Sequence, residues 1–179
     1  MAEAAAGISI GDAAPAFDLP DTEGARQSLS NGAEVTAVVF TCNHCPYALA
    51  WHDRINAVGR DYAGRGVRTL QICANDAERY PRDAPDAMRA RVEAGEFAGP
   101  YLHDATQEVA RSWGARVTPD VFVVDPSMHL AYRGAPDADH RDESLDAAWL
   151  RAALDAVLAG EPVAEPQTTP VGCSIKWRQ

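Results

Sequence analysis

The chain has 179 residues, 46% of them hydrophobic and 23% charged, which is typical of a globular protein with one folded domain. Its net charge of −10 argues against nucleic acid or an anionic membrane surface as a partner. No apolar run approaches the length of a membrane span, and the first residues lack the basic start and hydrophobic centre of a secretory signal. We therefore expect one domain over residues 1–179 in the cytoplasm, with a border segment at 1–16 and an extended tail at 161–179.

The first half of the chain predicts a hairpin, a strand and a helix. Residues 17–29 contain two short segments around a glycine-bearing turn, which favours a β-hairpin. The run Val35–Phe40 is rich in β-branched residues and predicts a buried strand. Apolar residues then recur at three- and four-residue steps, which is typical of an amphipathic helix. They are Ala48, Trp51, Ile55, Val58 and Tyr62.

Two cysteines separated by two residues, Cys42 and Cys45, fall where this strand passes into this helix. A helix N-terminus carries unpaired N–H groups and a partial positive charge, so it stabilises a thiolate, the reactive form of cysteine. We expect Cys42, just before the first turn, to be the more exposed sulfur and the one that attacks. Cys45 is then the shielded, resolving sulfur. A cationic His44 between them would lower the thiol pKa further.

The alternative for the cysteine pair is half of a structural zinc site. A closed zinc site needs four ligands, usually from a second paired set. The other cysteines, Cys73 and Cys173, are isolated in the sequence, and the remaining histidines show no paired spacing. They are His52, His103, His129 and His140. The pattern therefore favours dithiol–disulfide chemistry without a metal.

The second strand, residues 67–74, implies a parallel right-handed crossover from the first. Cys73 at its end reads as a small packed hydrophobe. The polar loop 75–81 follows at the carboxyl end of the strand, where sites form in α/β sheets, and Glu78 is its candidate proton-handling carboxylate. Asp83 is expected to cap the helix that follows, up to about residue 95.

The remaining residues predict two more helices and a hairpin. Asp104 is expected to cap a helix that ends at Gly114, and residues 120–125 and 128–132 predict an antiparallel hairpin. Ser144 is expected to cap the last helix. The tail contains three prolines, which is typical of a mobile terminus, but it also contains apolar residues and Cys173. We predict that it folds back towards the cysteine pair.

This order of elements resembles the thioredoxin fold, in the redoxin form with an N-terminal extension. The resemblance rests on three segments. Residues 40–47 are similar to the Cys-Asn-His-Cys-Pro signature of bacterial peroxiredoxin-like thioredoxin-family proteins, residues 116–122 to the cis-proline loop, and residues 171–177 to the tail of that subgroup. The fold implied is α/β, a three-layer α/β/α arrangement with a central mixed sheet and an N-terminal β-hairpin extension.

The resemblance also implies roles for Pro119 and Thr118. At two positions, however, the chain differs from thioredoxins and peroxiredoxins. Pro119 would follow a cis bond and pack beside the sulfurs, and the Thr118 backbone would pair with an extended thiol partner. Thr36 stands near the place where thioredoxins carry a buried aspartate, so the base for the resolving thiol would be Glu78 or water. Peroxiredoxins need a Thr or Ser three residues before the attacking cysteine, and Val39 holds that position before Cys42.

The function that we predict is a thiol–disulfide oxidoreductase whose Cys42–Cys45 dithiol exchanges with a partner protein or a small-molecule thiol. It needs no cofactor beyond its own redox-active disulfide, and Cys173 is a possible accessory thiol. Two alternatives stay open. One is a thiol peroxidase in which Cys42 becomes a sulfenic acid. The other is a metal-binding or redox-sensing module that uses Cys42, His44 and Cys45.

Overall fold

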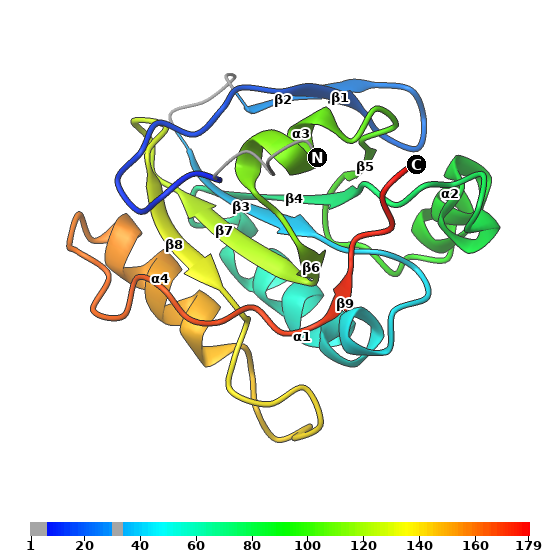
Figure 1. Ribbon diagram of the computed structural model, residues 1–179. Helices are drawn as coiled ribbons and strands as arrows, with labels where there is room; N and C mark the ends of the chain where they lie inside the picture. Colours follow the sequence, from blue (N-terminus) through cyan, green and yellow to red (C-terminus); the bar gives the residue numbers. More distant parts are fainter. Residues whose placement is uncertain (1–6, 30–33) are drawn as a thin grey trace.

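The centre of the protein is a five-stranded mixed sheet, in a computed structural model that describes residues 7–29 and 34–179 (Figure 1). The first six residues of the expected border segment lie outside that description. In spatial order the strands are β5 (Tyr101–His103), β4 (Val67–Cys73), β3 (Val35–Phe40), β7 (Asp120–Val124) and β8 (Leu130–Gly134). Strand β3 is parallel to β4 and antiparallel to β7, so the sheet is mixed around its central strand.

Helices cover both faces of this sheet, which confirms the predicted three-layer α/β/α class. Helices α1 (Pro46–Ala63) and α4 (Ala148–Leu158) lie on one face, and α3 (Glu108–Trp113) lies on the other (Figure 1). The predicted N-terminal hairpin is also present, as the antiparallel pair of β1 (Asp18–Pro20) and β2 (Arg26–Ser28) on the α3 side.

The core consists of two apolar layers separated by the sheet. All six residues of β3 are buried, because neighbouring positions point to opposite faces and both faces are covered. On the α1 side, Trp51, Ile55 and Leu154 pack against the sheet, and on the other side Trp113 packs against Phe40 and Phe122. Strand β3 is thus packed on both of its faces.

The helix α2 (Pro85–Glu93) begins one residue later than the sequence predicted. Its N-cap is Ala84, and the Asp83 side chain does not cap it. The reason is tertiary: the Asp83 carboxylate is completely buried and accepts hydrogen bonds from the segment that contains the cysteines. The prediction that Asp83 is a helix cap was therefore wrong.

Two other helices begin after a residue with a left-handed backbone. Gln107 precedes α3, and Ala147 precedes α4. The predicted caps lie further upstream, where Asp104 accepts a hydrogen bond from the Ala110 backbone N–H and Ser144 donates one within its own loop. Strand β5 was also missed, because three residues with no alternating pattern take strand form only through their pairing with β4.

The C-terminal tail folds back towards the cysteine pair, as predicted. Its strand β9 (Cys173–Ser174) pairs antiparallel with β6 (Val117–Thr118), and the two strands lie side by side in Figure 1. Ile175 next to it is 3% exposed and belongs to the core cluster on the α3 side. This buried anchor explains why a proline-rich tail is ordered.

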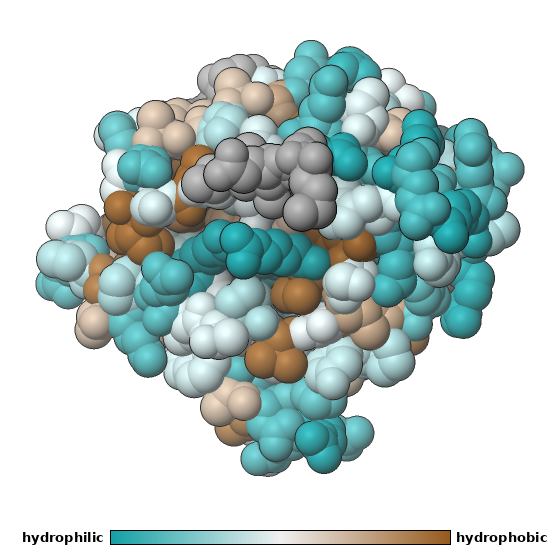
Figure 2. All heavy atoms as spheres, in the orientation of Figure 1, coloured by the Kyte–Doolittle hydropathy of each residue, from teal (hydrophilic) through white to brown (hydrophobic). Residues whose placement is uncertain are grey.

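The surface is mostly hydrophilic on the face that Figure 2 shows, with hydrophobic residues in small separate patches. Among the described residues, the exposed large hydrophobic side chains are Ile10, Leu49 and Val171. No helix within 7–29 or 34–179 combines the length and the apolar character that a membrane crossing requires.

The contact between β9 and β6 leads to a first prediction. A Cβ at Gly172 would lie 2.0 Å from the Thr118 carbonyl oxygen, so Gly172→Ala must push the tail away from β6. We expect a loss of about 1–3 kcal/mol in the free energy of unfolding, the usual cost of overpacking. Faster amide hydrogen exchange in residues 173–176 should accompany it. Gly64→Ala is the control, because a Cβ there meets nothing within 4 Å; equal stability of the two variants would contradict the prediction.

Candidate active site

The cysteine pair lies where the sequence placed it, at the end of β3 and the start of α1. Cys45 is the N-cap residue of α1 and Pro46 is the first helical residue. Cys42 precedes the helix, in the loop after β3. All four cysteines of the chain are free thiols.

Both cysteines are buried, and Cys42 is only slightly the more exposed of the two. Cys42 is 2% exposed and Cys45 is 0% exposed. The sequence pattern indicated an open helix end, but the folded chain packs two distant segments against that end. One is the loop that carries Asp83, and the other is β9 with Cys173. Tertiary packing therefore closes a site that local structure would leave open.

Thr118 contacts both sulfurs. Its peptide bond to Pro119 is cis, as the resemblance implied. The Thr118 hydroxyl lies 3.5 Å from Cys42 Sγ. The Thr118 carbonyl oxygen lies 3.2 Å from Cys45 Sγ and accepts a hydrogen bond from it while that thiol is protonated. Thr118, which was predicted to position a partner, therefore lies beside the cysteine pair, and Pro119 follows it through the cis bond.

The two thiols of the pair are coupled by a hydrogen bond, so one of their two protons is lost easily and the sulfurs share the other. A hydrogen bond from Cys42 lowers the pKa of Cys45 to about 4; Cys173, Thr118 and the Ala48 backbone N–H lower it too, against the effect of burial. Donating that hydrogen bond, together with burial, raises the pKa of Cys42. The negative charge thus lies on Cys45, whereas we expected it on Cys42. Because one proton shift along the shared hydrogen bond exchanges the two roles, first attack by Cys42 stays a prediction.

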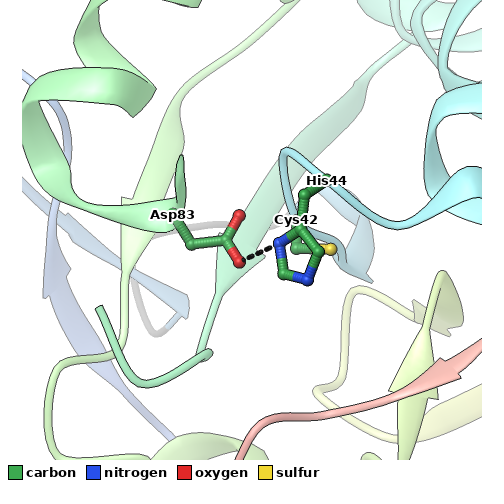
Figure 3. A group of neighbouring side chains, drawn as sticks. All are labelled: Cys42, His44 and Asp83. Atoms are coloured by element: carbon green, nitrogen blue, oxygen red, sulfur yellow. Dashed lines mark ion pairs between the residues drawn. The ribbon is translucent and has the colours of Figure 1, made fainter. Parts of the chain in front are cut away.

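His44 forms an ion pair with Asp83. The imidazole Nδ1 lies 2.6 Å from the Asp83 carboxylate, and Figure 3 shows the ring between that carboxylate and the Cys42 side chain. The His44 side chain is 20% exposed, whereas that of Asp83 is completely buried. The ring also stacks on Tyr80, with centroids 5.5 Å apart. Among residues 42–45, His44 is therefore the one that reaches solvent.

A hydrogen-bond network fixes the loop between the cysteines. Asp83 accepts from the Asn43 backbone N–H at 2.7 Å and from the Asn75 side chain at 2.9 Å. The Asn43 side-chain oxygen accepts from Tyr101 at 2.9 Å and from Arg91 at 2.8 Å. A buried carboxylate is costly unless its oxygens are satisfied, and these contacts satisfy Asp83.

Glu78, the carboxylate predicted to handle protons, is exposed, and its backbone N–H bonds to the Asp76 carboxylate. The carboxylate that reaches the motif is Asp83, five residues further along the chain. Sequence reasoning missed this role because a polar residue just before a helix is usually a cap. The position of the loop at the carboxyl end of β4 was the available signal, and it does mark the site.

A metal ion would find one candidate set of ligands among the described residues. Donor atoms of Cys42, His44 and Asp83 all lie within 4.8 Å of one another. Thiolate, imidazole and carboxylate are ligands that Zn²⁺ accepts, and three of them leave a fourth position open. The set differs from the alternative raised by the sequence, because Asp83 takes the place of Cys45.

The two remaining cysteines differ in their surroundings. Cys73 is completely buried, and burial raises its pKa to about 12, so it behaves as the packed hydrophobe that the sequence predicted. Cys173 is half-buried and packs against the cluster that contains Cys42 and Cys45. Burial also raises its pKa, to about 11.

The fold and this pair of thiols beside a cis Thr-Pro bond define a thioredoxin-fold redoxin. Residues 10–133 match the AhpC/TSA family, which is more than half of the chain. The protein therefore belongs to the AhpC/TSA family, and this membership supports a redox function in general. No curated protein matches the chain.

Solved structures agree with this assignment. The chain is similar to an uncharacterized conserved protein from Geobacillus kaustophilus, with 37% identity, a TM-score of 0.89 and coverage of 95% of this chain and 93% of that one. A hypothetical protein from Sinorhizobium meliloti 1021 has 36% identity, a TM-score of 0.90 and 97% coverage of both chains. A thiol:disulfide interchange protein of the thioredoxin family from Chlorobium tepidum TLS has 18% identity, a TM-score of 0.65 and coverage of 85% and 99%. That last likeness shows the fold alone.

The coupled thiols lead to a second prediction. The pKa of Cys45 is lowered, so its thiolate is present above about pH 4 and is lost only when the pH falls through that value. Thiolate absorbance at 240 nm should therefore be present at pH 7 in the reduced protein. Cys42→Ala should shift the midpoint upward, because it removes the hydrogen bond from the Cys42 thiol, which is the largest cause of the lowered pKa.

The control for this titration is Cys73→Ala, which removes a thiol that stays protonated at neutral pH. It should leave the midpoint unchanged. A wild-type titration midpoint of about pH 8.5, the pKa of a free thiol, would contradict the prediction.

Proposed function

We propose that the protein is a thiol–disulfide oxidoreductase whose reacting groups are Cys42 and Cys45. The observation that carries the proposal is the placement of two free thiols at a helix N-terminus, both in contact with Thr118 beside the Thr118–Pro119 cis bond. In the reductive direction, the Cys42 thiolate attacks a partner disulfide and one partner thiolate leaves. Cys45 then attacks Cys42 Sγ, so that the internal disulfide forms and the second partner thiolate leaves.

The neighbouring side chains supply the proton transfers that this exchange needs. The Thr118 hydroxyl, 3.5 Å from Cys42 Sγ, is placed to donate to a thiolate on Cys42. His44 lies beside the same sulfur, held by Asp83, and it is part-exposed. It is therefore the group that passes a proton between the leaving thiolate and solvent, and Asp83 is a positioning residue that acts through it.

The position of the tail limits the partner. The backbone of Thr118, which an extended thiol partner was expected to use, already pairs with Cys173. A small disulfide, or the end of a protein loop, is therefore the better substrate class than a long extended peptide. The reducing environment of a cytoplasm would keep the four thiols free, and we retain that location as part of the proposal.

The stabilised thiolate also predicts how the reduction potential of this couple differs from that of thioredoxin. A hydrogen-bonded thiolate stabilises the dithiol form, and a stabilised dithiol makes the disulfide a stronger oxidant. We expect a potential for the Cys42–Cys45 couple less negative than about −270 mV, the value of thioredoxin. Equilibration with glutathione buffers and mass spectrometry measures it; a value more negative than that would contradict this part of the proposal.

Turnover of a small disulfide tests the proposed roles. With glutathione disulfide as substrate and dithiothreitol as reductant, Cys42→Ser and Cys45→Ser should each reduce turnover to the uncatalysed rate, because each removes one sulfur of the exchange. Cys73→Ala should retain full turnover. Full turnover by Cys42→Ser would refute the assignment of the attacking sulfur.

Reaction with hydrogen peroxide distinguishes thiol–disulfide exchange from thiol peroxidase activity, an alternative with which the family match is compatible. Val39, in place of a hydroxyl residue, is completely buried on β3, so no hydroxyl side chain is present at that position to bind peroxide. Stopped-flow measurement with the reduced protein should give a rate constant no higher than that of free cysteine. A rate far above it would favour the peroxidase.

Metal analysis of protein purified without added metal tests the Cys42–His44–Asp83 set in the same preparation.

The ion pair leads to a further prediction. Asp83→Asn keeps the shape and one acceptor oxygen but removes the charge that holds His44. We expect turnover to fall by about 100-fold, the lower range for a positioned proton-transfer group, with a changed pH profile. Asp76→Asn is the control in the same loop, because Asp76 is buried but has no contact with the motif in the described network. A parallel loss at every pH in both variants would indicate a structural role only.

A further inference from the structure

Cys173 occupies the place that the fold offers to a substrate. It lies directly opposite Thr118 in the antiparallel pair of β9 and β6. This is the backbone edge beside the cysteine pair, where we expected an extended thiol partner. The chain thus presents one of its own thiols to its own active site, and Figure 1 shows β9 passing near the start of α1.

Several contacts hold Cys173 in this place. Gly172, just before it, lies so close to the Thr118 carbonyl that a Cβ would not fit. The Ile175 backbone N–H donates to the Arg116 carbonyl at 2.9 Å, and its side chain is buried in the core. The Lys176 backbone N–H donates to Asn75 Oδ1 at 2.8 Å. Because these contacts lie on both sides of Cys173, its thiol is positioned before any reaction begins.

Cys45 is the sulfur between the other two. It accepts a hydrogen bond from Cys42 and contacts Cys173 through a second one, and it lies 3.2 Å from the carbonyl oxygen of Thr118, the residue that pairs with Cys173. The Cys173 side chain packs against the cluster of Cys42 and Cys45. Three thiols are therefore arranged in a row, with Cys45 in the centre.

Cys173 is the most exposed thiol of this row. Cys42 and Cys45 are buried, whereas Cys173 is half-buried. A disulfide between the first two is hidden from a large reductant, and a disulfide that includes Cys173 lies nearer to solvent. Cys73, the fourth cysteine, is completely buried and is not part of this row.

From this arrangement we propose that Cys173 is a third redox thiol, which takes the disulfide from the buried pair and presents it to an external dithiol reductant. This inference rests on the proposed function, because it needs the Cys42–Cys45 disulfide as its starting state. It assigns to the tail the terminal step of turnover, and to Cys42 and Cys45 the reaction with substrate.

The transfer is balanced without any other reactant. The Cys173 thiolate attacks Cys45 Sγ, the Cys45–Cys173 bond forms, the Cys42–Cys45 bond breaks, and Cys42 leaves as a thiolate. One disulfide and one thiol are present before and after, and the proton lost by Cys173 is the one that Cys42 takes up. An external dithiol then reduces the Cys45–Cys173 bond by two electrons and is itself oxidised to a disulfide.

Disulfide mapping in Cys42→Ser protein tests the proposal. This variant retains Cys45, Cys73 and Cys173. After oxidation with diamide, alkylation and proteolysis, mass spectrometry should find an intramolecular Cys45–Cys173 bond, with Cys73 alkylated as a free thiol. Three free thiols, a Cys45–Cys73 bond or only intermolecular bonds would overturn the proposal.

Turnover with two reductants tests the role of the transfer. Cys173→Ser should lower turnover about tenfold when a protein dithiol, thioredoxin with its reductase, is the reductant, and should change it less than about twofold with dithiothreitol, because only the large reductant needs the disulfide brought outward. Cys73→Ser, which replaces a thiol outside the row, should behave as wild type with both. Equal turnover of Cys173→Ser and wild type with the protein reductant would overturn the proposal.

The two experiments also separate this inference from the proposed function. A Cys173→Ser variant that forms no Cys42–Cys45 disulfide would refute the proposed function, because in that variant the transfer cannot remove the disulfide from the pair. A Cys173→Ser variant that forms that disulfide, together with a Cys42→Ser variant that forms no Cys45–Cys173 bond, would refute the transfer alone.

Discussion

Thr118 is the residue on which the arrangement of the site depends. Its hydroxyl faces Cys42 Sγ, its carbonyl oxygen accepts from the Cys45 thiol, and its backbone pairs with Cys173. A single residue at the end of a short strand therefore joins the helix N-terminus to the C-terminal tail.

Burial gives this site its electrostatic character. A thiolate or a carboxylate out of water is costly, so each charge in the site has partners. Asp83 has an ion pair with His44 and hydrogen bonds from Asn43 and Asn75, and Asn75 in turn accepts from the tail at Lys176. Hydrogen bonds thus connect the motif, the loop after β4 and the tail. The thiol pair solves the same problem by sharing one proton between two sulfurs.

The closed site also distinguishes this chain from the open helix end that the motif suggested. His44 is the part-exposed residue among residues 42–45, and Cys173 is the half-buried thiol, so solvent reaches the site at these two side chains. In this site, negative charge is stabilised at the buried thiols, whereas molecules from solvent make their first contact at the part-exposed side chains. The relatives from Geobacillus kaustophilus and Sinorhizobium meliloti align with nearly the full length of the chain, so the tail is part of the shared fold.

The sequence by itself determined the elements whose signals are local. The β-branched run of β3, the helical period of α1 and the spacing of Cys42 and Cys45 between them predicted the strand, the helix and a thiol site at their junction, because each depends on neighbours in the chain. The same was true of the α/β class and of the resemblance that placed Pro119 beside the sulfurs. Only the tertiary structure decided that Asp83 is the partner of His44 instead of a helix cap, that Glu78 lies at the surface, and that Cys42 is buried. Those outcomes depend on contacts between segments far apart in sequence, and the free energy of burying a charge is set by whichever segments meet there.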